Sequence, residues 1–185
     1  MERLVPAKTA LLVVDVQERL AAAMPPEAME RLVQNAGILL DAAKLLGVRV
    51  FATEQYPKGL GATIPELARK LADASVSPAA KVTFDACSDL AVARALASAG
   101  VSSVVVVGME SHVCVFQTAR ELVKRGYATY VVGDAVASRR EENRHLGLTL
   151  CEKAGAIVTG TETVVFDWAE KAGTETFKAV SKLVK

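Results

Sequence analysis

Short apolar runs alternate along the whole chain with longer segments that have helical periodicity. Four of these runs follow a glycine, in KLLGVRVFAT, ASAGVSSVVVVG, VKRGYATYVVGD and EKAGAIVT. Each glycine stands where a residue in the left-handed conformation would end a helix before a strand begins. The pattern therefore predicts helix-to-strand joints at Gly47, Gly100, Gly126 and Gly155.

The apolar runs predict strands, and the segments between them predict helices. We expect strands near 10–15, 48–53, 103–108, 128–132 and 156–159, and a weak strand that ends near 81. We expect helices near 27–46, 65–72, 88–99, 113–125, 141–154 and 161–171. Several strands are continuous apolar runs, which indicates a sheet buried on both faces. The predicted fold is α/β, with a doubly wound, mainly parallel six-stranded sheet and helices on both faces.

Three further segments carry local signals. The stretch 54–63, EQYPKGLGAT, is rich in proline and glycine and is predicted to be a functional loop. Ser138 and Glu141 have capping-box spacing, which predicts the start of the helix near 141. The tail TFKAVSKLVK predicts a short amphipathic helix, packed on the domain or on a neighbouring subunit.

Composition and charge narrow the class of protein. The 185 residues are 51% hydrophobic with a net charge of +1, which gives no reason to expect nucleic acid or an acidic membrane as partner. No segment reaches the roughly 20 apolar residues that cross a bilayer, and the start MERLVPAKTA lacks the apolar core of a secretion signal. The 3 cysteines have no framework spacing, which indicates reduced thiols. We therefore expect one domain over residues 1–185, located in the cytoplasm.

Three reactive side chains stand at predicted strand ends. In a doubly wound sheet, ligands bind beyond the carboxyl ends of the strands, near the point where the strand order reverses. Asp15 closes the first predicted strand, Lys81 ends the third, and Cys114 lies in the turn after the fourth. Taken singly, they have ordinary interpretations as a turn aspartate, a surface lysine and a buried cysteine. Together they indicate a catalytic site.

The three side chains predict nucleophilic catalysis by the thiol. Cys114 is expected in the first turn of a helix that begins near Val113, where the helix dipole and a nearby Lys81 ammonium would favour a thiolate. Asp15 would accept the thiol proton and pass it to a leaving amine. Backbone N–H groups of the turn GMESHVC would bind the oxyanion.

The sequence resembles the isochorismatase-like cysteine hydrolases over essentially its whole length. The resemblance rests on LLVVDVQ, on the lysine of AAKVTF and on the block VVVVGMESHVCVFQTARELVKRGYATYVVGDAVASR. The stretch TEQYPKGLG places it near a small subgroup related to isochorismatase-domain-containing proteins. The resemblance implies a doubly wound parallel sheet and a catalytic triad of Asp15, Lys81 and Cys114. It also implies a cis peptide bond between Met109 and Glu110, with an oxyanion hole formed by the backbone N–H groups of Glu110 and Cys114.

The sequence departs from some members of this family. Nicotinamidases have an aspartate and several histidines after the second strand that bind a divalent metal, whereas this chain has FATEQYPKGLG there. Its two histidines, His112 and His145, lack convincing ligand spacing, so no metal and no other cofactor is expected. His112 is expected to point away from Cys114 rather than act as its base. Asp85 stands where the family often has serine, which alters the expected pocket chemistry.

Other side chains near the expected site have weaker assignments. Gln17 matches a recurring amide of the family and is expected to support the site or to line its pocket. Tyr56 and Phe84 flank strand ends and are candidates for pocket lining, with core packing as the alternative. Three more residues are expected to be buried or to have structural roles: Cys87, Cys151 and Trp168.

The expected activity is that of a metal-independent cysteine hydrolase of C–N bonds other than peptide bonds, which cleaves a small amide or carbamoyl compound through a thioester. A catalytically silent binding or scaffold protein and a redox-active thiol protein remain open. A redox sensor usually needs a resolving cysteine, and none lies near Cys114 in sequence, which favours hydrolysis. The expected partner is a small amide, and the resemblance makes a homo-oligomer the expected assembly.

Overall fold

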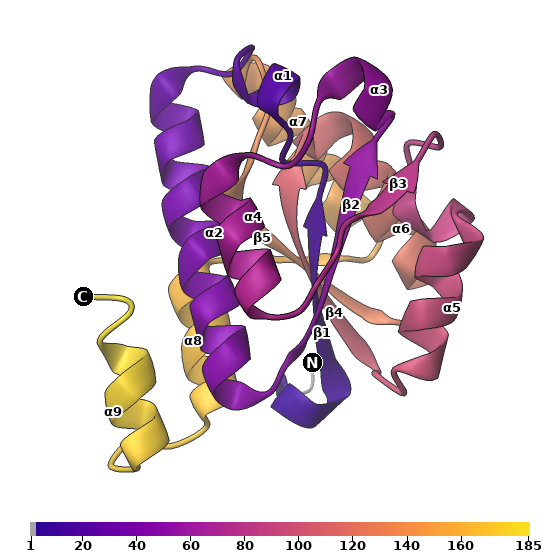
Figure 1. The fold of residues 1–185 in the computed structure, drawn as a ribbon. Coiled ribbons are helices and arrows are strands. Elements are labelled where there is room, and N and C mark those ends of the chain that lie inside the picture. The colour runs from indigo at the N-terminus through magenta and orange to yellow at the C-terminus, as the bar shows by residue number, and fades with distance from the viewer. Residues whose placement is uncertain (1–2) are drawn as a thin grey trace.

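The computed structural model describes residues 3–185, which form a six-stranded sheet with helices on both faces (Figure 1). The strand order is β3-β2-β1-β4-β5-β6, and every neighbouring pair is parallel. This confirms the predicted doubly wound α/β fold. The strands are β1 (Thr9–Val14), β2 (Arg49–Gln55), β3 (Ala79–Lys81), β4 (Ser103–Met109), β5 (Ala128–Ala137) and β6 (Ile157–Thr159).

Helices of two sizes connect the strands. The longer ones are α2 (Pro26–Leu46), α4 (Pro65–Asp73), α5 (Leu90–Ser98), α6 (Phe116–Lys124), α7 (Glu141–Lys153), α8 (Thr161–Ala169) and α9 (Glu175–Ser181). The shorter ones are the 3-10 turns η1 (Pro6–Lys8) and η2 (Ala86–Ser88), the helices α1 (Glu18–Ala21) and α3 (Pro57–Leu60), and the π-helical turn η3 (Ser111–Val115).

Each face of the sheet has its own apolar core. Leu11 and Val105 belong to the core that packs against α2, α4 and α8, whereas Leu12 and Val106 belong to the core formed with α5, α6 and α7. Figure 1 shows α2 and α8 on one side of the sheet and α5 and α6 on the other. Successive side chains of a strand point to opposite faces, so a strand covered on both faces is apolar throughout. This explains the uninterrupted apolar runs of β1 and β4.

The predicted glycine joints are confirmed. The φ angles of Gly47, Gly100, Gly126 and Gly155 are 69°, 64°, 87° and 95°, all in the left-handed region. A residue with a Cβ atom adopts these angles only at a steric cost, so glycine is the favoured residue there.

The strand order reverses between β1 and β4. From β1 the chain winds outward through β2 to β3, and it then crosses to β4 and winds outward through β5 to β6. Asp15 directly follows β1, Lys81 is the last residue of β3, and Cys114 lies in η3 directly after β4. Because parallel strands end at the same side of the sheet, the topology gathers these three residues at one end.

Some local predictions differ from the structure. The segment predicted as the loop 54–63 contains the end of β2 and the short helix α3. The helix expected from residue 88 begins at Leu90, because the Asp89 carboxylate accepts hydrogen bonds from the N–H groups of Ala91 and Val92, at 2.9 and 3.2 Å. Strand β5 also runs five residues beyond its predicted end at 132, to Ala137.

The helix start predicted near 141 is confirmed, because α7 begins at Glu141, but the predicted capping box at Ser138 is wrong. Helix α7 has Arg140 at its N-cap, with no side-chain hydrogen bond to the first turn. The Ser138 hydroxyl is buried instead against the turn after β4, where its Oγ lies 2.6 Å from Oγ of Ser111. A tertiary contact thus replaces the local one that the spacing suggested.

The predicted C-terminal helix packs on the domain. It forms α9, in which Val180 is buried in the core and the Phe177 ring lies 6.0 Å from the Phe166 ring of α8. Trp168 of α8 is also buried, as predicted.

Candidate active site

Asp15 is fully buried at the end of β1 and has a left-handed backbone with φ of 53°. Its N–H donates to the carbonyl of Thr53 at 3.1 Å, which fixes the start of the turn after β1. The Thr53 hydroxyl donates to Oδ1 of Asp15 at 2.7 Å, and the Lys81 ammonium donates to Oδ2 at 2.7 Å. The carboxylate is therefore held by one neutral and one charged donor.

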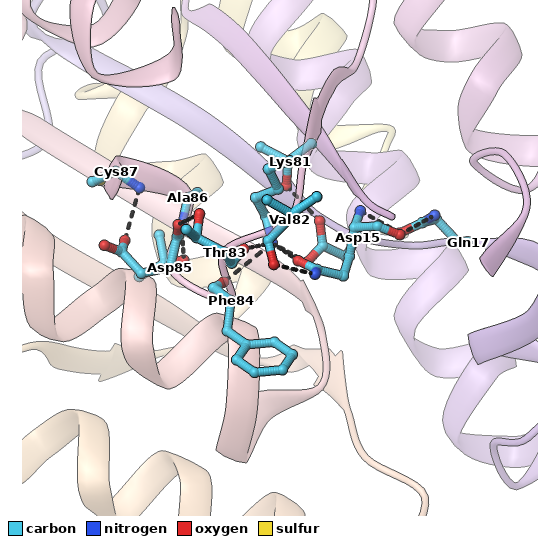
Figure 2. Close-up of polar contacts among 12 residues, drawn as sticks. Asp15, Gln17, Lys81, Val82, Thr83, Phe84, Asp85, Ala86 and Cys87 are labelled. Atoms are coloured by element: carbon cyan, nitrogen blue, oxygen red, sulfur yellow. Dashed lines mark hydrogen bonds and ion pairs between the residues drawn. The ribbon is translucent and has the colours of Figure 1, made fainter. Parts of the chain in front are cut away.

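The Lys81 ammonium is also fully buried and has a complete set of acceptors. Besides Asp15, Nζ donates to Oε1 of Gln55 at 2.7 Å and lies 3.1 Å from the carbonyl oxygens of Thr83 and Phe84. Figure 2 shows the chain from Lys81 to Phe84 folded back around the ammonium, with Asp15 facing it. A buried charge is costly unless it is paired and hydrogen-bonded, and both conditions are met here.

Cys114 brings its thiol to the same carboxylate. It is 5% exposed in η3, and its thiol is hydrogen-bonded to the Asp15 carboxylate. Burial, followed by the Asp15 charge and hydrogen bond, raises the pKa of the Cys114 thiol to about 12, although the Lys81 charge acts in the opposite direction. The expectation of a resting thiolate is therefore wrong. Burial beside a carboxylate outweighs the nearby ammonium, and the raised pKa favours a neutral resting thiol.

The turn that carries Cys114 has two backbone features. The peptide bond between Met109 and Glu110 is cis. Gly108 has φ of 122°, and a Cβ atom there would lie 2.0 Å from the carbonyl oxygen of Val14. Only a glycine permits this approach of β4 to β1, which brings the turn close to Asp15.

Gln17 has a structural role beside the site. It is fully buried, and its Nε2 donates to the carbonyl oxygens of Gln55 and Gly61 at 3.0 and 2.7 Å. Its Oε1 accepts a hydrogen bond from the N–H of Gln55 at 2.7 Å. Of the two roles expected for Gln17, these bonds agree with structural support, because both polar atoms of its amide tie the turn after β1 to β2.

Aromatic and aliphatic side chains lie exposed around Lys81. Tyr56, which is 54% exposed, lines a cavity of about 360 Å³ together with Lys81, Val82 and Asp89. Phe84 is 52% exposed and lies on the segment that wraps the Lys81 ammonium. The structure thus places Tyr56 in a cavity wall beside the site and Phe84 on the adjacent surface, and neither in the core.

The other two cysteines and Asp85 lie outside the cluster of Asp15, Lys81 and Cys114. Cys87 and Cys151 are buried in the core beside α5 and α7, as predicted. Asp85 caps η2, where its carboxylate accepts from the Cys87 N–H and the Ser88 hydroxyl at 2.7 and 2.6 Å.

The two histidines have different partners. Nδ1 of His112 lies 3.0 Å from Oγ of Ser138, and His145 lies 3.3 Å from the Glu141 carboxylate on the surface. Within residues 3–185, no group of three or more histidine, cysteine, aspartate or glutamate side chains is placed to hold a metal ion. No helix in the same range is long and apolar enough to span a membrane.

Sequence reasoning missed Thr53 and Gln55, which hold the Asp15 carboxylate and the Lys81 ammonium. A signal was available, because Thr53 and Gln55 stand at alternate positions at the polar end of β2. Side chains at alternate positions point to the same face, so both would be expected beside the ends of β1 and β3.

The buried thiols predict a loss of stability at alkaline pH. Burial raises the pKa values of Cys87, Cys114 and Cys151 from an ordinary 9.0 to about 12. Above pH 9 the unfolded chain releases thiol protons that the native chain retains. The free energy of unfolding is therefore highest below pH 9 and falls as the pH rises towards 12. Each thiol contributes a loss of up to about 1.4 kcal/mol per pH unit.

Urea unfolding between pH 8 and 10.5 measures this loss. Cys151→Ala removes one of the three thiols from the core without touching the candidate site, so its unfolding free energy should fall less steeply with pH than that of the unaltered protein. Lysines and tyrosines titrate in both proteins and cancel in the comparison. Identical slopes would contradict the prediction.

Comparisons with known proteins give this geometry a context. The family model described as Isochorismatase domain matches residues 9–163. A relative from Phytophthora sojae, named secreted isochorismatase effector Isc1, is 37% identical over 99% of this chain and 87% of its own length. The solved structure described as MAR1 ribonuclease from Caenorhabditis elegans is 37% identical, with a TM-score of 0.91 over 99% of this chain and 92% of its own.

A solved structure with lower sequence identity to this chain has a similar fold. The YcaC protein of Escherichia coli, described as an octameric hydrolase of unknown specificity, is 22% identical and has a TM-score of 0.85 over 98% of this chain and 90% of its own. At that identity the likeness concerns the fold alone.

Proposed function

The chain belongs to the isochorismatase family, and from this premise we propose that it is a cysteine hydrolase that cleaves the C–N bond of a small amide or carbamoyl compound through a thioester, without a metal. One observation carries the proposal. The fully buried Asp15 carboxylate contacts both the Lys81 ammonium, at 2.7 Å, and the Cys114 thiol.

The first half of the reaction forms the thioester. As Sγ of Cys114 attacks the amide carbon, the thiol proton moves to the Asp15 carboxylate, so the nucleophile is generated at the moment of attack. The Lys81 ammonium offsets the negative charge that develops on sulfur and substrate. The backbone N–H groups of Glu110 and Cys114 are the proposed donors to the tetrahedral oxyanion. The intermediate collapses when Asp15 returns the proton to the leaving amine.

The second half releases the acid. A water molecule attacks the thioester carbon while Asp15 accepts its proton, and the proton then passes to sulfur as the C–S bond breaks. The neutral Cys114 thiol is thereby restored. Every proton moves among the thiol, the Asp15 carboxylate, the amine and water, so the route requires no metal ion.

A panel of small primary amides and carbamoyl compounds tests this proposal. We expect the purified protein to release ammonia from at least one of them, and quenched mixtures to contain an acyl adduct on Cys114 by mass spectrometry. EDTA should leave the rate unchanged. A rate that EDTA abolishes and zinc or manganese restores would contradict the metal-free route. A panel without turnover and without any adduct would favour a silent binding protein.

Ribonuclease activity is a second candidate, because the relative from Caenorhabditis elegans that bears this description is 37% identical. Cleavage of an RNA strand has no step that forms a thioester on Cys114. RNA degradation that persists in Cys114→Ala, by protein free of contaminating nuclease, would therefore support the ribonuclease assignment and weigh against the amide hydrolase.

We also propose that the protein forms a homo-oligomer through the surface beside Lys81. Four exposed apolar side chains lie on the segments near it: Tyr56 and Val82 line the cavity beside Lys81, and Phe84 and Leu90 follow in the chain. Val82 alone is 77% exposed. Large apolar side chains exposed in one region are typical of sites that contact another protein.

Val82→Asp is expected to convert the oligomer to a monomer of 19.6 kDa, because a charge in the centre of this surface would be desolvated on association. Light scattering coupled to gel filtration measures the mass. Leu146→Asp is the matched control, since Leu146 is 51% exposed on α7 away from this surface and should leave the mass unchanged. A monomeric unaltered protein, or an unchanged mass for Val82→Asp, would rule out this interface.

A cytoplasmic location is part of the proposal. Cys87, Cys114 and Cys151 are free thiols, as expected in a reducing compartment. The relative from Phytophthora sojae is named a secreted effector, so fractionation of the source cells is the direct check on location.

A further inference from the structure

Ser138, at the carboxyl end of β5, joins the two residues in the middle of the turn after β4. Its Oγ lies 2.6 Å from Oγ of Ser111 and 3.0 Å from Nδ1 of His112. Ser138 is 1% exposed and Ser111 is fully buried. A hydroxyl has one donor and two acceptor sites, so it can serve both partners in either tautomer of the histidine. An alanine at this position could serve neither.

Helix α7 closes the other side of the same two residues. A Cβ atom at Gly147 would lie 2.5 Å from the carbonyl carbon of Ser111 and 2.6 Å from the N atom of His112. The helix backbone is therefore in direct contact with the backbone of the turn. The turn is therefore packed against α7, and the two hydrogen bonds of Ser138 tie the same residues to the end of β5.

We propose that Ser138 is a positioning residue, which acts through Ser111 and His112 to hold the oxyanion donors of the turn in place. The inference rests on the proposed function. Ser111 and His112 lie between Glu110 and Cys114, whose backbone N–H groups are the proposed donors. A rotation of the two middle residues would therefore move both donors relative to the developing oxyanion. Ser138 itself touches neither substrate nor the Cys114 thiol.

Two reactions of Cys114 separate positioning of the donors from reactivity of the thiol. Acylation by p-nitrophenyl acetate forms an Sγ–C bond and expels p-nitrophenolate through a tetrahedral oxyanion, while the thiol proton passes to Asp15. Alkylation by iodoacetamide displaces iodide from a saturated carbon and forms no oxyanion. Loss of oxyanion positioning should therefore slow acylation and spare alkylation.

Ser138→Ala is expected to lower the rate of Cys114 acylation about tenfold and to change the alkylation rate by less than about twofold. Thr129→Ala is the matched control. Thr129 lies at the opposite end of β5, is 2% exposed, and donates its hydroxyl to the carbonyl of Tyr127 at 3.1 Å. It should leave both rates unchanged although it also removes a buried hydroxyl from the same strand.

Two substitutions of His112 test the same positioning role without altering Ser138: His112→Leu and His112→Asn. Leu should slow acylation as Ser138→Ala does, whereas Asn, whose amide can replace Nδ1, should restore most of the rate. The double variant Ser138→Ala, His112→Leu should be about as slow as the slower single variant, because both remove the same hydrogen bond.

Equal loss of acylation and alkylation in Ser138→Ala, or loss of neither, would overturn the positioning role. So would fully additive effects of the two substitutions. If the unaltered protein is acylated no faster than Cys114→Ala, the thioester chemistry itself is absent, and the proposed function falls together with the inference.

Discussion

Cys114→Ala is expected to lower amide hydrolysis by about 10⁴-fold or more, to the background rate. Without sulfur no thioester can form, and the Asp15 carboxylate has no thiol from which to accept a proton. The substitution leaves the methylene group of a residue that is 5% exposed, so the fold should persist with a loss of about 1 kcal/mol in the free energy of unfolding. Ammonia release and the mass of the acyl adduct are the measurements.

Cys151→Ala is the control for this result. Cys151 is also buried, in α7, and a cavity there should destabilise the protein by a similar amount without loss of turnover. Hydrolysis that survives in Cys114→Ala, or that disappears equally in Cys151→Ala, would refute the assignment of Cys114 as the nucleophile.

Asp15→Asn is expected to abolish hydrolysis and also to destabilise the fold by about 3–5 kcal/mol. The Lys81 ammonium is fully buried, and the substitution removes the one negatively charged partner that it has within residues 3–185, while an amide remains in place. Asparagine cannot accept the thiol proton, so the attack loses its base. Urea unfolding and ammonia release give the two effects separately.

The thiol provides a third measurement on the same variant. Because the Asp15 charge and hydrogen bond raise the pKa of Cys114, their removal lowers that pKa and increases the thiolate fraction at neutral pH. Alkylation of Cys114 by iodoacetamide should therefore become faster in Asp15→Asn while hydrolysis is lost. Parallel loss of both would contradict the role of Asp15 as a proton acceptor.

Two controls isolate the buried pair. Asp41→Asn breaks the ion pair between Asp41 and Lys70, whose side chains are 41% and 35% exposed, and should cost less than about 1 kcal/mol. Asp15→Asn combined with Lys81→Met removes both charges and should recover much of the stability but none of the activity. Failure of the double variant to recover stability would mean that the loss does not arise from an unpaired ammonium.

Local and periodic features of the sequence were sufficient for the fold. Continuous apolar runs predicted strands buried on both faces, and four glycines marked the helix-to-strand joints that the structure has. These signals can be read from the chain because they arise from steric limits on neighbouring residues and from burial of whole elements.

Predictions that depended on a residue's distant neighbours were less accurate. The capping-box spacing of Ser138 and Glu141 was local, but the Ser138 hydroxyl bonds to Ser111, 27 residues away. The sequence left two roles open for Gln17, and its amide bonds to Gln55, 38 residues away, favour structural support. In both cases the side chain has several possible partners and bonds to one that is distant in sequence. The spacing of neighbouring residues does not reveal such a partner.

The sequence by itself determined the order of the strands and helices and the presence of an acid, a cation and a thiol at strand ends. Only the tertiary structure decided their protonation and their partners. The charge state of a side chain depends on burial and on nearby groups, and for Cys114 the largest effect after burial comes from Asp15, 99 residues earlier in the chain. Distances of that kind are set by the packing of the whole sheet, which no short stretch of sequence records.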